Sequence, residues 1–169
     1  MSVHIQTQRL LLKPFSDHDR DAILALLTNE QIKQTYMIPD FHSPEQAEKM
    51  FHRFQELSLS EDRYVAGMYL NNALIGFLND VGIHDHEIEL GYVVDPRYHN
   101  QGYATEALKA VIAHLFRQGF RQISAGAFED NPASIRVMVK SGMTLLDKTE
   151  DMDYRGVTHH CVYYSIQKK

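Results

Sequence analysis

Residues 89–108 have the sequence ELGYVVDPRYHNQGYATEAL, and this stretch decides the fold. We predict a strand at Glu87–Val94 and, after a turn, the clearest helix in the chain. Apolar residues recur along that helix at spacings of three and four, and Gly119 stands where the helix should stop. The recurring residues are Ala104, Ala107, Leu108, Val111, Ile112 and Leu115.

The turn at residues 97–104, RYHNQGYA, has small residues at Gly102 and Ala104, so its backbone N–H groups can approach a ligand closely. Unpaired N–H groups at the start of a helix, together with the helix dipole, bind anions, and glycine has no Cβ to block the contact. We therefore predict a diphosphate site here. The alternative is a glycine that only eases a tight turn. The spacing matches neither a Walker A loop nor a GxGxxG dinucleotide motif.

The rest of the chain alternates helices and strands without a linker or an internal repeat. Strands are predicted at Leu10–Lys13, Tyr64–Leu70, Ala73–Asn79, Gln122–Phe128, Met143–Thr149 and Val157–Ile166. Helices are predicted from Ser16 to about Thr28, from a capping box at Ser43-Pro44-Glu45-Gln46, and from Pro132 to about Ser141. Asn71-Asn72 suits a tight hairpin. This order predicts a mixed α/β sheet in one domain, residues 1–169, with a parallel crossover around residues 89–128.

The composition excludes several classes of protein. With 44% hydrophobic and 23% charged residues, the chain has an ordinary globular balance. Its apolar runs are far shorter than a membrane span and its start is no signal peptide, so we expect a cytoplasmic protein that needs no membrane. The net charge of −5 disfavours nucleic acid and mildly favours a cationic substrate. A solvated acidic face is the other explanation for Asp85, Glu87, Glu89, Glu129 and Asp130.

The cysteine and the histidines give no metal site. The single Cys161 lies in an alternating apolar segment, where we expect a buried structural thiol. His84 and His86 flank Asp85 in a turn, and the pair 159–160 lies on opposite faces of a strand, so neither pair forms a shared ligand set.

Five segments together resemble the GCN5-related N-acetyltransferase (GNAT) superfamily, and most of all its ribosomal-protein N-terminal acetyltransferase-like branch. They are TQRLLLKP at 7–14, ELGYVVDP at 89–96, GYATEAL at 102–108, NPAS at 131–134 and KSGM at 140–143. The resemblance covers nearly the whole chain in the right order. It implies a GNAT fold, with a mostly antiparallel sheet of about seven strands, a splayed parallel pair and about four flanking helices.

The resemblance also implies that acetyl-CoA is the acetyl donor. Its pantetheine arm would lie between the strands at 89–94 and 122–128, which splay apart at a bulge, and its diphosphate would lie on the backbone of 99–104. The N–H near Val94 would polarise the thioester carbonyl, while Asn131 and Ser134 would face the pantetheine and the sulfur. The implied cofactor-binding residues are Tyr92, Val93, Val94, His99, Asn100, Gln101, Gly102, Tyr103, Ala104, Thr105, Asn131 and Ser134.

Two positions depart from the family pattern. His99 stands where the loop usually begins with Gln or Arg, so we expect a weaker side-chain contribution to diphosphate binding. Met138 stands where a tyrosine often serves as general acid. Ser134 becomes the candidate acid, with another tyrosine or water as alternatives.

Acetyl transfer requires an uncharged amine, and Glu89 is our candidate general base, acting directly or through water. Glu129 is the reserve candidate, and a plain surface glutamate is the alternative reading of Glu89. Near pH 7, deprotonation costs roughly 4 to 5 kcal/mol for a lysine-like amine but about 1 kcal/mol for an α-amino group. A peptide N-terminus therefore asks less of the base than a polyamine does.

Three hypotheses follow from the sequence. The first is an enzyme that moves an acetyl group from acetyl-CoA to a primary amine, on a protein or peptide N-terminus or on a small molecule. The second is a non-catalytic acyl-CoA-binding sensor or partner module, favoured by Met138 and His99. The third is an unrelated α/β protein that binds another phosphate at Gly102. A homodimer is expected only from the habit of the family.

Overall fold

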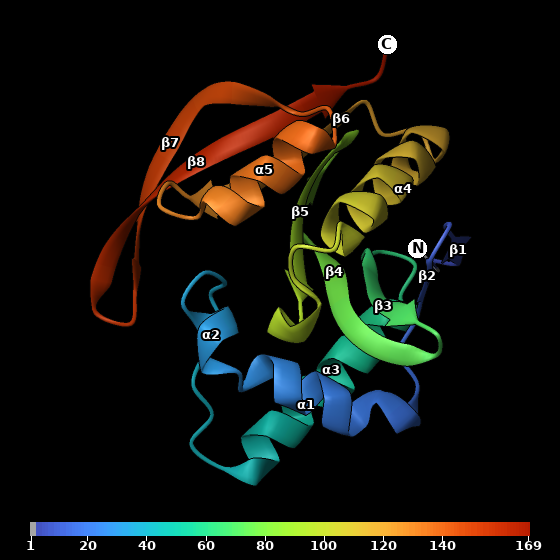
Figure 1. Cartoon of the computed structure of the whole chain (residues 1–169), viewed down its shortest axis with the longest axis vertical. Coiled ribbons are helices and arrows are strands. Elements are labelled where there is room, and N and C mark those ends of the chain that lie inside the picture. Colours follow the sequence, from blue (N-terminus) through green and yellow to red (C-terminus); the bar gives the residue numbers. More distant parts are fainter. Residues whose placement is uncertain (1–2) are drawn as a thin grey trace. The chain divides into compact units, whose positions relative to one another are not determined.

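The computed structural model describes residues 3–169 and divides the chain into two compact units. The first unit comprises the chain up to residue 79 together with 92–103, and the second comprises 80–91 and 104–169. Strands β4 (Ala73–His84) and β5 (Glu87–Val94) each pass from one unit into the other. The strand order is β1-β2-β3-β4-β5-β6-β8-β7 (Figure 1). The sheet thus has eight strands, one more than expected, and is mostly antiparallel with a single parallel pair.

The strands of the first unit form an antiparallel ladder. A two-residue strand, β1 (Ile5–Gln6), which the sequence did not predict, pairs with β2 (Leu10–Lys13). Strand β2 pairs in turn with β3 (Val65–Leu70), and β3 with the first half of β4. The predicted hairpin is confirmed at Asn71 and Asn72, whose φ angles are 49° and 66°. Asparagine adopts this left-handed region more readily than most residues.

The helices of the first unit begin at polar caps. Ser16 starts a 3-10 turn rather than the helix itself, and α1 (Arg20–Leu27) follows it. The Ser43 hydroxyl accepts from the N–H of Gln46 at 3.3 Å and starts α3 (Pro44–Leu59). Only half of the expected capping box forms, because the Gln46 side chain accepts from the N–H of His42 at 2.8 Å, one residue before the cap.

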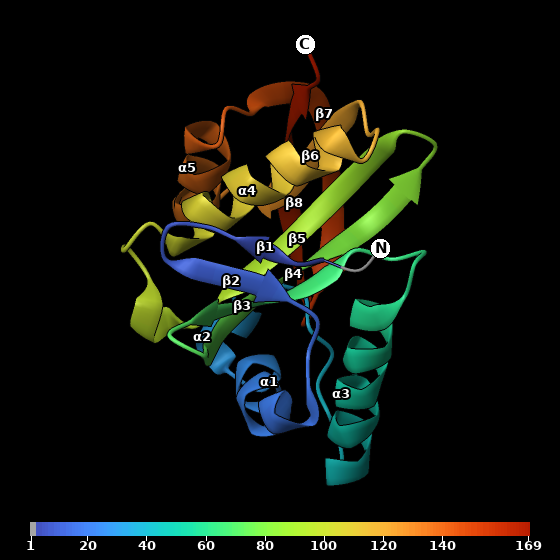
Figure 2. The same cartoon turned by 90° about the vertical axis from the view of Figure 1, so that its right-hand side faces the viewer.

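The sequence missed the helix α2 (Glu30–Lys33), which is only four residues long. Its cap is Asn29, whose side chain accepts from the N–H groups of Gln31 and Ile32. Helices α1 and α3 lie side by side, as Figure 2 shows. Their apolar faces, together with β3, β4 and the end of β5, make the core of this unit. That core is built around Phe15, Ile23, Leu27, Phe51, Val65, Phe77 and Val93.

The second unit contains the parallel pair. Strand β5 pairs with β6 (Gln122–Phe128) through Glu87↔Gln122, Ile88↔Ile123 and Glu89↔Ser124. This confirms the parallel relation predicted for the crossover. On the other edge of β6 lies β8 (Val157–Gln167), paired in turn with β7 (Thr144–Tyr154), and both pairings are antiparallel.

Two strands run further than the sequence indicated. Strand β4 continues past Asn79 to His84, and β7 continues past Thr149 to Tyr154. Residues 149–154 of β7 pair continuously with β8 although most of them are exposed. Within this stretch, Met152 and Tyr154 pack against the small cluster of Phe128, Cys161 and Tyr163, so the apolar pattern is confined to two positions and is too short for a sequence reading to detect.

The helices of the second unit match their predicted faces. Helix α4 (Tyr103–Arg117) buries the predicted Ala107, Leu108, Val111, Ile112 and Leu115. Its stop at Gly119, with φ of 101°, is confirmed. Helix α5 (Pro132–Lys140) contacts β6, and Gly142 after it has φ of 89°. Among residues 3–169, no helix is long and apolar enough to cross a membrane.

Candidate functional site

The loop between β5 and α4 belongs to the first unit and is stiffened by its own side chains. The Asp95 carboxylate accepts from the N–H of Arg97 at 2.9 Å and from its guanidinium at 2.6 Å. The Arg97 guanidinium holds the pKa of Asp95 below its ordinary value. Further on, Asn100 and Gly102 have φ angles of 59° and 83°. These left-handed residues turn the backbone just before α4 begins at Tyr103.

His99 turns its ring toward its own loop. Its Nε2 lies 2.7 Å from the carbonyl oxygen of Val94. Since a carbonyl can only accept, Nε2 must carry the hydrogen in this contact. The side chain at this departure from the family pattern therefore braces the start of the loop, and Asn100, Gln101 and Gly102 remain exposed.

Arg9 also lies against this loop, although it is 92 residues from Gln101 in the sequence. Its Nη1 donates to the carbonyl oxygen of Gln101 at 2.9 Å, and its guanidinium carbon lies 4.4 Å from the centroid of the Tyr103 ring. Its Nη2 is 3.3 Å from the point where a Cβ on Gly102 would lie. A permanent positive charge thus accompanies the N-terminus of α4, where the helix dipole already favours an anion.

Glu89 is the most perturbed carboxylate in the second unit. Its side chain is 26% exposed, and burial raises its pKa above the ordinary glutamate value. Lys148 of β7 lies 4.0 Å from the carboxylate and opposes this rise, whereas the negative charge of Glu150 adds to it.

Tyr163 of β8 joins the same cluster. Its hydroxyl donates to the Glu150 carboxylate at 2.9 Å, and the ammonium of Lys148 lies 3.9 Å from its ring centroid. Burial, followed by the hydrogen bond to Glu150, raises the pKa of Tyr163. Gly126 makes room for this ring, because a Cβ there would approach it to 2.8 Å. The four side chains at 89, 148, 150 and 163 form what we call the Glu89 cluster.

Ala104 and Thr105 lie in the first turn of α4, and the other predicted residues of the second unit lie at or near α5. The Asn131 side chain caps this helix by accepting from the N–H of Ser134 at 3.2 Å, and Ser134 itself is half-buried. Met138, the second departure from the expected pattern, is fully buried and belongs to the core. Glu129, the reserve base, is exposed at the end of β6.

Cys161 is buried, as predicted, and burial raises the pKa of its thiol, which favours the unreactive protonated form. His159 stacks on Phe128 with ring centroids 4.0 Å apart, next to Tyr154, so this tyrosine packs against the strand face. His160 points elsewhere and contacts Asp151 at 2.7 Å. Within the described residues, no group of three or more His, Cys, Asp or Glu side chains could hold a metal ion.

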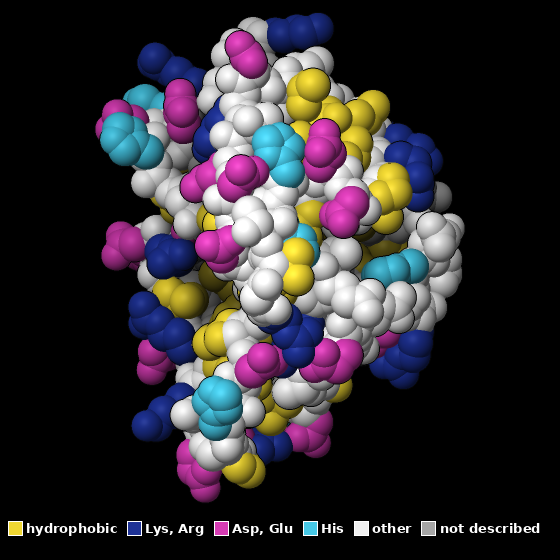
Figure 3. Space-filling model, turned by 90° about the vertical axis from the view of Figure 1, so that its left-hand side faces the viewer, with side chains coloured by type: hydrophobic (Ala, Val, Ile, Leu, Met, Phe, Trp, Pro, Cys, Tyr) yellow, Lys and Arg dark blue, Asp and Glu magenta, His cyan; other side chains and the backbone are white. Residues whose placement is uncertain are grey.

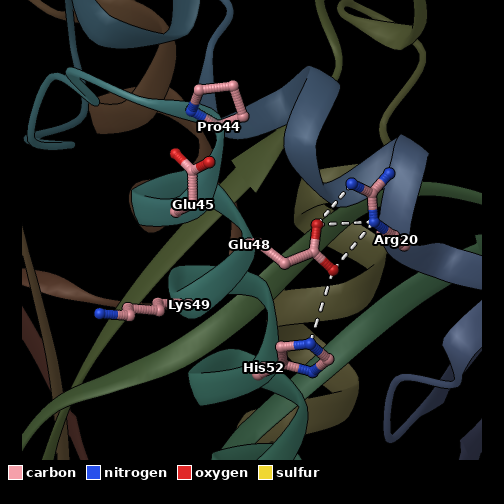
Figure 4. Close-up of a pocket in the computed structure, with 6 residues that line it drawn as sticks. All are labelled: Arg20, Pro44, Glu45, Glu48, Lys49 and His52. Atoms are coloured by element: carbon pink, nitrogen blue, oxygen red, sulfur yellow. Dashed lines mark hydrogen bonds and ion pairs between the residues drawn. The ribbon is translucent and has the colours of Figure 1, made fainter.

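A hollow of about 410 Å³ lies between α1 and α3 of the first unit (Figure 4). Its central carboxylate, Glu48, already accepts from Nε of Arg20 at 2.7 Å and lies 3.5 Å from the ring of His52. Pro44, Glu45 and Lys49 complete the lining. Arg20, Glu48 and His52 are therefore engaged with one another in this hollow, and none of the predicted site residues lines it.

The family model described as the acetyltransferase (GNAT) domain matches residues 9–144. The chain belongs to this family. It is therefore an acetyl-CoA-dependent acyltransferase, and the hypothesis of an unrelated phosphate-binding protein is wrong.

Relatives agree over nearly the full length. The chain is 28% identical to the N-acetyltransferase YoaA of Bacillus subtilis (strain 168), with 97% of this chain and 96% of the relative covered. It is 31% identical to the N-acetyltransferase YnaD of the same organism, with 83% and 82% covered. The fold is that of RimL, a ribosomal L7/L12 α-N-protein acetyltransferase, whose apo structure has a TM-score of 0.86 at 22% identity, with 99% and 96% covered. A structure of RimL in complex with coenzyme A has a TM-score of 0.82 at 20% identity, with 95% of both chains covered.

Arg9 and Lys148 are GNAT site candidates that sequence reasoning did not single out. Arg9 lies within the quoted motif TQRLLLKP but was given no role, and nothing in the local pattern connects it with Gln101. Lys148 is one of several polar residues in β7. On the face shown in Figure 3, basic side chains are interspersed with acidic ones and do not gather into one field.

Proposed function

We propose that this GNAT enzyme acetylates the free α-amine of a peptide or protein N-terminus or of a small molecule, with Glu89 as general base. The proposal rests chiefly on the half-buried Glu89 carboxylate and its raised pKa. A base is most effective when its pKa approaches the working pH, and burial moves Glu89 in that direction.

The proposed reaction proceeds by direct attack. The amine nitrogen forms a bond to the thioester carbonyl carbon and gives a tetrahedral oxyanion, which the N–H of Val94 stabilises. The C–S bond then breaks and its electron pair leaves with the sulfur of coenzyme A. Glu89 takes the proton that the amine nitrogen loses, directly or through water, and the released thiolate takes a proton from Ser134 or from water.

Glu89 is preferred to Glu129 because burial distinguishes them. Glu129 is exposed. Its backbone N–H donates to the backbone carbonyl oxygen of His160 at 2.8 Å, and this bond fixes the main chain of Glu129 rather than its carboxylate. Glu89 lies in a cluster with a lysine and a second glutamate, so its pKa responds to defined neighbours. Such a perturbed carboxylate is the better candidate for a catalytic role.

Ser134 or water is preferred to Tyr163 as general acid. The raised pKa of Tyr163 and its hydrogen bond to Glu150 make this phenol a poorer proton donor than an ordinary tyrosine. A thiol has an ordinary pKa of about 8.5, so the thiolate is a good leaving group and needs little assistance from a general acid. We therefore assign Tyr163 to holding Glu150 and Lys148 in place.

The loop before α4 in the first unit is the proposed element for binding the acetyl donor. Its exposed backbone at Asn100–Gly102, the N-terminus of α4 and the charge of Arg9 would hold the cofactor diphosphate. Each of these groups attracts an anion, and Asp95 is already neutralised by Arg97.

The acceptor proposal is tested by thiol release from acetyl-CoA. One panel offers short peptides with a free α-amine, and a matched panel offers the same peptides with the α-amine blocked and one lysine exposed. At pH 7 we expect the first panel to react faster, by up to about 10²-fold, because its amines deprotonate at lower cost. Equal rates would contradict the α-amine assignment. If no peptide in either panel and no small amine led to thiol release, the enzymatic proposal would be contradicted for these acceptors.

A further inference from the structure

Gly76 of β4 faces the end of β5 inside the first unit. A Cβ built on Gly76 would overlap the carbonyl oxygen of Val93 and would lie 3.0 Å from Cα of Val94 and 3.1 Å from the carbonyl carbon of Val93. All three neighbours are backbone atoms. Gly76 is not among the glycines with positive φ, so an alanine could adopt its backbone angles. The close approach of β5 alone requires glycine here.

This contact orients one peptide group. The oxygen of Val93 lies closer to the Cβ position than its carbonyl carbon does, so the carbonyl is directed at Gly76. In a planar trans peptide the C=O and the N–H point in opposite directions. The same peptide group carries the N–H of Val94, which is therefore directed away from β4.

The next peptide group is fixed from both ends. The N–H of Asp95 donates to the carbonyl oxygen of Ile75 at 2.8 Å, one residue before Gly76. The carbonyl oxygen of Val94 accepts from Nε2 of His99 at 2.7 Å. The backbone around Val94 thus has little freedom to adjust if a methyl group is added on β4.

We infer that Gly76 is a positioning residue for acetyl transfer, and that His99 supports it from the other side. The inference rests on the proposed function, in which the N–H of Val94 donates to the thioester carbonyl. A methyl group at position 76 would push the Val93–Val94 peptide away from β4 and turn this N–H from its direction. The diphosphate contacts lie further along the loop, so the catalytic step should suffer more than cofactor binding.

Two other glycines provide matched controls. Gly82 lies on the same strand, and a Cβ there would meet nothing within 4 Å. Gly67 lies on β3, and a Cβ there would meet side-chain atoms of Tyr69, Leu74 and Phe15 at 2.7 to 2.9 Å. Gly82→Ala therefore controls for the substitution itself, and Gly67→Ala controls for crowding that does not reach the Val93–Val94 peptide.

The experiment combines kinetics with infrared spectroscopy of bound acetyl-CoA labelled with ¹³C at the thioester carbonyl. A hydrogen bond lowers the stretching frequency of this carbonyl, so the band reports the N–H of Val94. In Gly76→Ala we expect the band to move up toward the frequency of the thioester in an aprotic solvent and kcat to fall about 10²-fold, as for a misplacement of about 1 Å. KM for acetyl-CoA should change less than about 3-fold, which is under 1 kcal/mol. Gly82→Ala and Gly67→Ala should keep the wild-type band.

His99→Ala keeps the test decisive if Gly76→Ala does not fold, because it removes the hydrogen bond to Val94 without adding a methyl group. A band that moves in His99→Ala supports the inference, and an unchanged band overturns it. A wild-type band at the frequency of the thioester in an aprotic solvent also overturns it, since there is then no hydrogen bond to position. A wild-type band that is shifted, without any amine turnover, contradicts the proposed function and leaves the positioning of the thioester supported.

Discussion

The loop before α4 and the Glu89 cluster differ in how far apart in the sequence their contacting residues are. In the loop, backbone groups and nearby side chains make most contacts, such as Val94 with His99 and Asp95 with Arg97. In the Glu89 cluster, a glutamate on β5, two residues on β7 and a tyrosine on β8 meet only through the fold. Nearby residues therefore determine most of the conformation of the loop before α4, whereas the pKa of the candidate base Glu89 depends on residues that are distant in the chain.

The largest effect should come from Glu89→Gln, which removes the base while keeping the shape of the side chain. We expect kcat to fall by about 10² to 10⁴, the usual contribution of general base catalysis. The dissociation constant for coenzyme A, measured by calorimetry, should remain near the wild-type value. Glu87→Gln is the matched control, since Glu87 lies on the same strand but is exposed. If Glu89→Gln kept the wild-type kcat, Glu89 would not be the general base.

A smaller effect is expected for Arg9→Ala, which tests the loop before α4. It removes the hydrogen bond to Gln101, the contact with Tyr103 and a positive charge near the diphosphate. The two contacts are worth about 1 kcal/mol each, and loss of about 1.4 kcal/mol of this from cofactor binding should raise KM for acetyl-CoA about 10-fold with kcat nearly unchanged. Lys13→Ala is the control, because Lys13 lies over the ring of Tyr69 instead. A fall in kcat alone would assign Arg9 to the chemical step.

The smallest effect should be a displacement of the pH profile in Lys148→Met. In the proposed mechanism the carboxylate form of Glu89 is the active base, so kcat/KM is expected to decline as the pH falls through the pKa of Glu89. Lys148 lowers this pKa, and its removal should therefore move the acidic limb to higher pH. Glu150→Gln should move the limb to lower pH, because Glu150 raises the same pKa. If the acidic limb stayed at the same pH in both variants, the group that titrates in the profile would not be Glu89.

The elements nearest the opening motif could be predicted from sequence because their signals are local. Strand β5, the turn at Gly102 and helix α4 were expected at or within a residue or so of their observed bounds. Helix α2 and strand β1 were not expected, because four and two residues are too short to show a period. The far half of β7 was missed because its pairing with β8 involves mostly exposed residues.

The candidate site divides along the same line. The backbone loop and Glu89 were selected from sequence, and their roles remain predictions. Arg9 was not given a site role because its partner Gln101 is 92 residues away, and Lys148 because its partners lie on other strands. Gly76 carries no sequence signal of its function, since only the approach of the β5 backbone reveals why a side chain is excluded.

The passage of β4 and β5 through both units also bears on how the chain folds during synthesis. The first unit needs residues up to 103, so the ribosome must release the whole β4–β5 hairpin before that unit is complete. Strand β5 cannot pair with β6 until residues from Gln122 onward are synthesised, and β6 cannot pair with β8 until residues 157–167 follow. Because N-terminal parts fold first during translation, the nascent chain should hold a finished loop before α4 while the candidate base Glu89 still lacks its neighbours Lys148 and Tyr163.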